Sequence, residues 1–390
     1  MATILITGGT GMIGTALSQM LIEKNYDVIL LSRRGGGGAG AANGKIVHMQ
    51  WDPEKGTIDA EAIRRADHII HLAGAGVADK RWSAKRKREI VESRTHSSAL
   101  LVKALGEIPN NVKTVVSASG IGWYGPDPSI PNPRPFVETD PVDDDFLGET
   151  CRVWEESISG VAGPAGRADV ARGGNVAGAA GSGGMGGVAG AGSAGGFAGV
   201  EGSAGAEHVG AFAGVGTSAG TEHVGAFAGA AGEGISRATA PRGLDKRLVI
   251  FRIGLVLSNK GGALAEFRKP VKLGVAAILG SGKQVMSWIH VEDLCRLFCE
   301  AIENNNWAGV YNAVAPQPVD NRTLTLELAR RLKGRYYVPI YVPSFLLKII
   351  VGEMSIEVLK STTVSVQKLR QSGFQFLHPS IQHALDDLVK

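Results

Sequence analysis

The sequence predicts an α/β protein built on a doubly wound parallel sheet. Three observations support this prediction. Short apolar runs without polar alternation recur through residues 4–119, as in strands that are buried on both faces. Segments whose apolar residues have helical spacing separate these runs. The first run, Ile4–Ile6, leads through a glycine-rich turn directly into such a segment, Thr15–Glu23.

The glycine-rich turn reads GGTGMIG over residues 8–14. Its glycines allow the backbone to turn sharply and to approach a ligand closely, and the following helix presents unpaired N–H groups and the positive end of its dipole. Strand, turn and helix in this order predict a binding site for the pyrophosphate of a dinucleotide rather than an ordinary strand–helix turn. The residues expected to line this site are Gly8, Thr10, Gly11, Met12, Ile13 and Gly14.

A second strand is expected at Asp27–Ser32 and is followed by Arg33. In dinucleotide-binding folds the end of this strand faces the adenosine ribose, where an acidic side chain suits NAD and an arginine suits the 2′-phosphate of NADP. No acidic residue follows the strand here. The sequence therefore predicts NADP as the cofactor, with Ser32 and Arg33 as phosphate contacts. A solvated basic turn is the alternative.

A third strand is expected at Ile46–Gln50, after a flexible connection at Gly35–Gly44 that should lie near the adenosine. Asp52 follows this strand and precedes a proline. Its carboxylate could accept a hydrogen bond from the adenine amino group, although an Asp before a proline is as often a turn residue. Both interpretations of Asp52 stay open at this point.

Two further buried strands are expected at Asp67–Ala73 and Thr114–Ser119, separated by a helix over Lys85–Leu105. Small residues at the end of the first strand would let the backbone pass close to the cofactor. The contacts expected there are Leu72, Ala73 and Gly74. Because the carboxyl ends of parallel strands meet at the ligand crevice, Ser119 and Tyr124 are the catalytic candidates.

Several separated motifs resemble the extended short-chain dehydrogenase/reductases. They read TGGTGMIG, HLAG, SASGIGWYG, FRIGLVLS and SWIHVEDL, in that order. More narrowly, residues 1–154 and 247–390 are similar to the atypical subgroup called epimerase family proteins, whose activity is largely unassigned. The resemblance implies an NADP-binding Rossmann-like domain with a smaller, substrate-facing C-terminal part. A homodimer is a further expectation from the resemblance.

The resemblance also exposes a departure. In catalytically competent relatives, a serine is followed by a Tyr-x-x-x-Lys pair on the next helix, where the lysine lowers the pKa of the tyrosine that exchanges the proton. Ser119 matches the serine, but whether Phe146 or Leu147 is aligned with the tyrosine, Thr150 or Cys151 stands four residues later. Neither frame restores the pair, which the atypical subgroup also lacks. The nearby polar candidates are Tyr124, Glu149 and Arg152, for which packing, a helix salt bridge and a solvated charge are explanations at least as good as catalysis.

A long Gly/Ala-rich insert occupies Ser159–Gly243, with near-identical repeats at Ser203–Gly214 and Ser218–Gly229. Disorder is expected, because ordering glycine-rich backbone costs more entropy than such small side chains recover on burial. As a helix-to-strand connection, the insert should lie at the amino edge of the sheet and be dispensable for cofactor binding. The expected parts of the chain are therefore 1–158, the insert at 159–243, the rest of the sheet and the substrate region at 244–338, and a small helical domain at 339–390.

The C-terminal half contains fewer chemical signals. A strand is expected at Leu248–Leu257, and Phe267–Gly280 should help to frame the substrate crevice. His290 precedes a helix over Glu292–Asn304 and has either a structural role or that of a proton carrier. The small C-terminal domain has no chemistry that these residues reveal.

Composition limits the remaining functions. The net charge of +4 is small for 390 residues, and the dense basic run at Lys80–Arg88 fits a solvated helix face better than a nucleic-acid site. Cys295 and Cys299 have no second pair or suitably spaced histidine, so we expect no metal and thiols in a reducing cytoplasm. The apolar run Ser344–Gly352 is too short to span a bilayer and contains a lysine, so no membrane partner is expected.

Two hypotheses for the function follow. The first is an NADP(H)-binding oxidoreductase or epimerase/dehydratase-like protein that acts on an unidentified small substrate. The second is a non-catalytic NADPH-binding sensor or scaffold. The glycine-rich turn and Arg33 support both equally, whereas the missing Tyr–Lys pair favours the second over ordinary sugar-nucleotide epimerisation.

Overall fold

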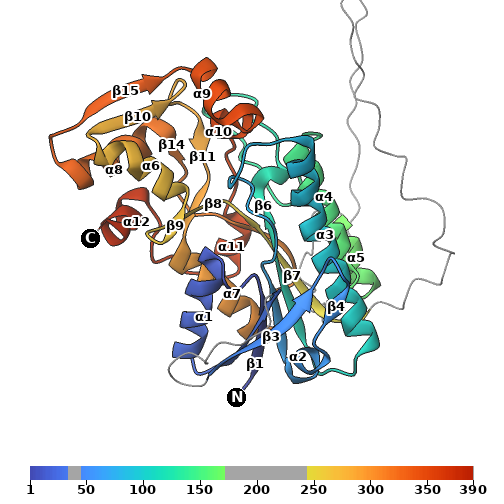
Figure 1. The fold of residues 1–390 in the computed structure, drawn as a ribbon. Coiled ribbons are helices and arrows are strands. Elements are labelled where there is room, and N and C mark those ends of the chain that lie inside the picture. The colour runs from blue at the N-terminus through green and yellow to red at the C-terminus, as the bar shows by residue number, and fades with distance from the viewer. Residues whose placement is uncertain (34–44, 172–243, 390) are drawn as a thin grey trace, which may run out of the picture. The chain divides into compact units, whose positions relative to one another are not determined.

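The computed structural model describes residues 1–33, 45–171 and 244–389, which lie in a unit formed by residues 1–176 and 241–390 (Figure 1). The main sheet has the strand order β13-β7-β6-β5-β1-β2-β3-β4, and every neighbouring pair except β3–β4 is parallel. Its strands are β1 (Thr3–Thr7), β2 (Asp27–Ser32), β3 (Ile46–Asp52), β4 (Thr57–Ile58), β5 (His68–His71), β6 (Thr114–Gly120), β7 (Arg247–Ile253) and β13 (Gly309–Ala313).

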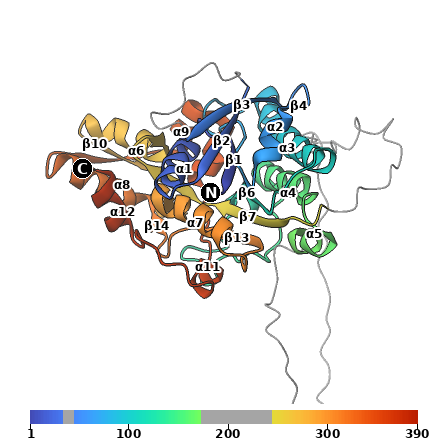
Figure 2. The same cartoon turned by 90° about the horizontal axis from the view of Figure 1, so that it is seen from below.

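The central strand β1 shows why the sheet is covered on both faces. Its alternate side chains Ile4 and Ile6 belong to one apolar cluster, while Leu5 belongs to another, and all three are fully buried. Helices α1 (Met12–Glu23) and α7 (Val291–Glu303) supply the first cluster, and α2 (Ala60–Arg65), α3 (Ala84–Glu107) and α4 (Phe146–Ser159) supply the second. Figure 2 shows these two layers of helices on opposite sides of the sheet. The expected doubly wound, Rossmann-like parallel sheet is confirmed.

The strand order places the ligand crevice. β1 lies between β2 and β5, so the chain winds outward in both directions from β1. The carboxyl ends on either side of such a switch point leave a crevice between the diverging connections. The glycine-rich turn, the end of β2 and the residues after β5 all lie at these ends.

The strand expected at Leu248–Leu257 is wrong in one respect, because it breaks at Gly254. β7 stays in the main sheet, whereas β8 (Leu255–Ser258) pairs with β12 (Trp288–His290) and β9 (Gly261–Gly262) in a separate sheet. A Cβ atom at Gly254 would lie 2.5 Å from the carbonyl oxygen of Ser287, so only glycine permits this close crossing.

The segment after β8 builds a second lobe. Its helices α6 (Ala263–Lys272), α8 (Asn321–Lys333) and α12 (Ile381–Leu388) share an apolar cluster with Trp288. Two small sheets complete it, β10 (Val275–Leu279) with β15 (Val338–Val342), and β11 (Val285–Met286) with β14 (Val319–Asp320). The short elements of the C-terminal part are α9 (Ser344–Val351), η2 (Gly352–Met354), α10 (Ser355–Leu359) and α11 (Gln367–Gln371), and η1 (Ile121–Trp123) follows β6.

The disorder expected over Ser159–Gly243 is wrong for the first residues of this insert. Residues up to Ser159 complete α4, and Pro164–Ala171 form helix α5, with Val170 buried against the sheet. An apolar anchor therefore orders this stretch despite its small residues. Residues 172–243 and the connection at Gly35–Gly44 lie outside the described residues. In the described ranges, no helix combines the length and the apolar character needed to cross a membrane.

Candidate functional site

The glycine-rich turn is packed so tightly at Gly8 and Gly14 that a side chain cannot replace either glycine. Gly8 has a φ of +70°, and a Cβ atom there would lie 2.8 Å from the carbonyl carbon of Leu72. A Cβ atom at Gly14 would lie 2.5 Å from the carbonyl oxygen of Gly8. The N–H group of Gly11 donates to that same oxygen at 3.0 Å and closes the turn. The structure thus brings the predicted residues at the start of α1 and after β5 together.

The N-terminus of α1 is open to an anion. Gly11 is the N-cap residue, no side chain caps the helix, and its first turn contains no acidic residue. Thr10 and Gly11 are exposed, whereas Met12 and Ile13 are half-buried. The unpaired N–H groups of the first turn and the helix dipole therefore remain available to a negatively charged group. By contrast, α4 has Asp145 as its N-cap, with the carboxylate accepting from the N–H of Gly148 at 2.6 Å.

A buried histidine holds the two strand ends against each other. The Thr7 hydroxyl oxygen accepts from the N–H groups of Leu72 and Ala73, both at 3.2 Å, and lies 2.7 Å from Nδ1 of His71. His71 is fully buried, and burial, together with the charge of Arg94, lowers its pKa to about 3. The ring is therefore neutral and structural at physiological pH. No local sequence pattern predicts this role of His71.

The end of β2 places the two expected phosphate contacts at the carboxyl edge of the sheet. Ser32 is half-buried and pairs in register with Gln50 of β3, and Arg33 is exposed immediately after the strand. A guanidinium in this position is free to meet a phosphate at the same edge of the sheet as Gly8. Arg34 and the following connection lie outside the described residues.

The side chain of Asp52 stabilises the turn that follows β3. Its Oδ1 atom accepts from the N–H groups of Glu54 at 3.1 Å and Lys55 at 3.3 Å, and Oδ2 lies 3.3 Å from Nζ of Lys55. Of the two interpretations that the sequence left open, the geometry matches the turn residue. A contact to adenine would have to compete with these bonds.

The two catalytic candidates belong to one buried network. The Ser119 hydroxyl donates to Oε1 of Glu155 at 2.7 Å, and Arg252 binds both oxygens of Glu155 at 2.8 and 2.9 Å. The Tyr124 hydroxyl donates to the side chain of Asn312 at 2.7 Å and accepts from Arg252 at 3.2 Å. Arg252 and Tyr124 are fully buried, and Glu155 is 2% exposed. The structure brings Ser119 and Tyr124 close together, but through groups that already have partners.

This network suits a structural role better than proton transfer. Burial raises the pKa of Tyr124 well above its usual range, although Arg252 opposes the shift. The guanidinium of Arg252 also lies 3.5 Å from the ring centroid of Trp123, which adds a cation–π contact. Tyr124 stacks on Phe136 with ring centroids 5.3 Å apart. A neutral, tightly packed phenol of this kind is a poor acid and a poor base.

No acid–base pair stands where the Tyr-x-x-x-Lys motif would lie. Phe146 packs edge-on against Trp82, with ring centroids 4.9 Å apart. Leu147 packs against Gly122, and a Cβ atom added to Gly122 would lie 2.9 Å from the Cβ atom of Leu147. The thiol of Cys151 donates to the carbonyl of Gly120 at 3.4 Å, and burial raises its pKa to about 11. Phe146, Leu147 and Cys151 therefore supply no phenol and no ammonium group here, and the nearby cation is Lys87, whose Nζ lies 5.0 Å from the ring centroid of Phe146.

The two polar candidates of α4, Glu149 and Arg152, belong to an exposed salt-bridge group. Arg152 donates from Nε to Glu149 at 2.7 Å and from Nη1 to Glu156 at 2.6 Å. All three side chains are more than a third exposed. Such pairs at helical spacing contribute a few tenths of a kcal/mol, about 0.3–0.5, to stability. The geometry here matches the solvated salt bridge that the sequence offered as an alternative.

A lysine and three carboxylates join the start of α4 to the C-terminal domain. Nζ of Lys360 lies 2.7 Å from Asp145, 3.8 Å from Glu357 and 3.9 Å from Asp143. Lys360 is 7% exposed, so these charges interact at partly buried positions. Burial and the neighbouring Asp145 raise the pKa of Glu357 to about 7, against the opposing effect of Lys360. No local sequence pattern predicts this group, because its members come from distant segments.

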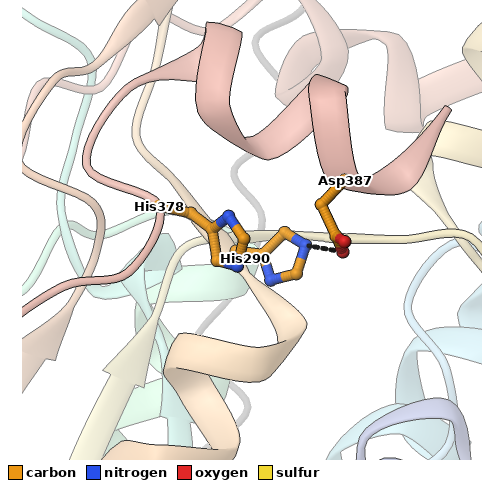
Figure 3. A group of neighbouring side chains, drawn as sticks. All are labelled: His290, His378 and Asp387. Carbon is orange, nitrogen blue, oxygen red and sulfur yellow. Dashed lines mark ion pairs between the residues drawn. The ribbon is translucent and has the colours of Figure 1, made fainter. Parts of the chain in front are cut away.

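A second titratable group connects α7 to the C-terminus. His290, His378 and Asp387 bring ligand-type atoms within 4.8 Å of one another (Figure 3). Nδ1 of His290 accepts from the N–H of Glu292 at 3.1 Å and thereby caps α7. Nε2 of His290 consequently carries the proton of the neutral ring and points toward Asp387, 3.4 Å away.

The geometry of this group disfavours a metal ion. A neutral His290 whose Nδ1 accepts a backbone N–H has no lone pair left on Nε2 for coordination. The two imidazole rings also stack, with centroids 3.7 Å apart and planes 30° apart, so their in-plane lone pairs do not converge. Burial and the adjacent His378 lower the pKa of His290 to about 4. These contacts instead fasten the C-terminal segment to the start of α7.

Comparison with known proteins identifies two parts of the chain. Residues 4–145 match the NAD dependent epimerase/dehydratase family, and residues 342–388 match a domain of unknown function, DUF1731. An epimerase family protein of Mycobacterium leprae is 27% identical over 98% of this chain and 94% of its own. The human epimerase family protein SDR39U1 is 25% identical over 99% of both chains.

Solved structures show the same fold. The crystal structure of human SDR39U1 (isoform 2) with NADPH superposes with a TM-score of 0.68 at 23% identity, covering 99% of both chains. MoeE5 in complex with UDP-glucuronic acid and NAD gives a TM-score of 0.63 at 15% identity and covers 100% of this chain and 98% of its own. The chain is thus similar to the NAD dependent epimerase/dehydratase family in residues 4–145 and to DUF1731 in residues 342–388.

Proposed function

We propose that the protein is an NADP(H)-binding oxidoreductase or epimerase/dehydratase-like protein that acts on a small substrate. The observation that carries the proposal is the start of α1, which has no side-chain cap and no acidic residue and lies beside the end of β5. Backbone N–H groups there are placed to hold the diphosphate of a dinucleotide. NADPH is present in the human neighbour, whereas MoeE5 was solved with NAD.

Arg33 supports NADP over NAD. It is exposed directly after β2, and no acidic residue occurs between Ser32 and Lys45 to bind the ribose 2′-hydroxyl of NAD. When bound, the nicotinamide supplies or accepts a hydride. The chain's own contribution is then to hold the phosphates through the turn and Arg33, and to let the backbone at Leu72–Gly74 pass close to the cofactor.

A non-catalytic NADPH sensor is the second candidate. The observation that favours it is the buried network around Arg252, because both Ser119 and Tyr124 have their polar atoms engaged there. The apolar surface formed by Leu147 and Cys151 supplies no replacement acid. A protein that binds NADPH without transferring its hydride would need neither a free serine–tyrosine pair nor a replacement acid.

Calorimetric titration with NADPH and NADH tests the binding proposal. We expect the Arg33→Ala variant to bind NADPH about tenfold or more weakly, since a charge-assisted hydrogen bond to phosphate contributes roughly 1.5–3 kcal/mol, while NADH binding stays unchanged. Arg65→Ala, at an exposed arginine of α2, is the matched control. Equal losses for both nucleotides, or none for NADPH, would contradict the assignment of Arg33.

A screen of carbonyl substrates that follows NADPH absorbance separates the two candidates. Turnover by the wild-type protein that disappears in Ser119→Ala would support the enzyme. NADPH binding without turnover, unchanged in Ser119→Ala, would support the sensor. Because Ser119 donates to a buried carboxylate, the variant's urea unfolding has to be measured alongside its activity.

A further inference from the structure

The C-terminal half exposes an unusual concentration of apolar side chains. Of the 13 large apolar residues that are exposed in the described ranges, most lie on or beside β15 and α9. Tyr336 is 86% exposed, Phe345 66% and Ile349 65%. We call seven of these residues the β15–α9 surface, which comprises Tyr336, Val338, Ile340, Phe345, Leu346, Ile349 and Ile350. Contiguous exposed apolar surface of this kind marks an interaction site.

The arrangement of the elements leaves this surface uncovered. β10 and β15 form a two-stranded parallel sheet, and Ala276 of β10 packs against α6 and α8 on one face. Because side chains alternate along strands, the other face carries Val275, Ala277 and Leu279, in register with Val338, Ile340 and Val342. Figure 1 shows α6 and α8 beside β10, and α9 following the end of β15. An entirely apolar sheet face thus continues into an apolar helix.

Positive charge surrounds the surface. Residues 267–291 and 328–352, which include both strands and α9, contain nine lysines and arginines and no acidic residue. Three of the nine cations, Lys269, Arg330 and Arg331, pair with Glu266 and Glu327 just outside these ranges. Lys272, Arg335 and Lys348 are exposed beside the apolar side chains. A partner must therefore accept aliphatic and aromatic groups together with several cations. An anionic phospholipid surface has both properties.

We propose that the β15–α9 surface docks the protein on an anionic phospholipid bilayer. α9 has eight residues, which is too short to span a bilayer but sufficient to lie in its interface. Phe345, Ile349 and Ile350 then enter the region between headgroups and acyl chains. Tyr336 lies at the headgroup level, where amphipathic aromatic rings are favoured. The cations meet the lipid phosphates.

A second copy of the chain fits the same surface less well. Two copies facing each other would bring the same cations together without acidic partners. Pairing through the free edge of β15 is also impaired. Val338 donates to Gly274 and Val342 accepts from Gly280, so Pro339 and Tyr341 face the free edge, and Pro339 has no N–H group.

Vesicle co-sedimentation of the full chain tests the proposal. We expect binding to vesicles of phosphatidylcholine with about a third phosphatidylglycerol, little binding to phosphatidylcholine alone, and release at about 1 M salt. Arg335→Glu with Lys348→Glu should weaken binding by about tenfold or more. Phe345→Ser with Ile349→Ser should weaken it to a similar extent. These side chains are exposed, so unchanged thermal unfolding can confirm that the variants fold.

Two matched controls lie elsewhere on the molecule. Lys103→Glu changes an exposed cation of α3, and Leu377→Ser changes an apolar side chain that is 50% exposed. Both should bind anionic vesicles like the wild type. Failure of the wild type to sediment with anionic vesicles would overturn the proposal, as would equal binding by the surface variants. A dimer that the surface variants abolish, found without vesicle binding, would assign the surface to a second copy instead.

Discussion

Two polar regions lie at the carboxyl ends of the sheet strands, and they differ in whether their hydrogen-bonding groups have partners. At the start of α1, no side chain caps the helix and Gly11 is exposed. Around Arg252, the oxygens of Glu155 and the hydroxyls of Ser119 and Tyr124 all have protein partners. The first region is ready to bind a charged group. The second is already complete without one.

This difference shows that polar residues at strand ends can be structural as well as catalytic. Ser119 and Tyr124 have the residue types and the strand-end position of catalytic groups, yet the ion pair between Glu155 and Arg252 engages both of them. A buried ion pair needs its remaining donors and acceptors satisfied, because an unmade hydrogen bond there is costly. The network therefore explains Ser119 and Tyr124 without any substrate.

Removing one partner from the buried network should have the largest effect. Arg252→Met leaves the carboxylate of Glu155, which is 2% exposed, without its cation. We expect a loss of about 3–5 kcal/mol in the free energy of unfolding, measured by urea denaturation. Arg152→Met, which breaks an exposed pair with Glu149, should cost less than about 1 kcal/mol. Similar losses in the two variants would show that the buried network is not what distinguishes this region.

Adding a carboxylate to the open region should separate stability from binding. Gly11 has extended N-cap geometry, with φ at −75° and ψ at 172°, so Gly11→Asp can cap α1. We expect stability to rise by about a few tenths of a kcal/mol, whereas NADPH affinity falls about 100-fold or more through repulsion of the phosphates. Gly11→Asn caps the helix without the charge and should bind NADPH more tightly than Gly11→Asp. If calorimetry finds equal affinities, the phosphates do not lie at this helix.

The same comparison explains what the sequence could predict. The glycine turn and β2 depend on local signals, an unbroken apolar run and glycines at fixed spacing, so Asp27–Ser32 was predicted with its observed bounds. The pairing of Glu155 with Arg252 joins residues 97 apart, and no local pattern encodes it. The break at Gly254 depends on the approach of Ser287, which only the folded chain reveals.

The group around Lys360 is intermediate between the open start of α1 and the buried network around Arg252. It is partly buried, and its single lysine faces three carboxylates. The pKa of Glu357 is raised to about 7, so the folded protein binds a proton that the unfolded chain releases near its ordinary pKa of about 4.3. Stability should therefore fall as pH rises from about 4.3 to 7 and then level off.

Glu357→Gln removes this titration and should flatten the pH dependence. Relative to the wild type, we expect the variant to gain roughly 2–3 kcal/mol in unfolding free energy between pH 5 and pH 8, measured by urea denaturation. Asp145 keeps its 2.7 Å contact with Lys360, so the lysine retains a partner. Glu107→Gln, at an exposed glutamate of α3, is the control and should run parallel to the wild type. Parallel profiles for Glu357→Gln and the wild type would mean that the carboxyl of Glu357 is ionised at neutral pH. Lys360 would then balance more of the surrounding negative charge than its distances to Asp143 and Glu357 suggest.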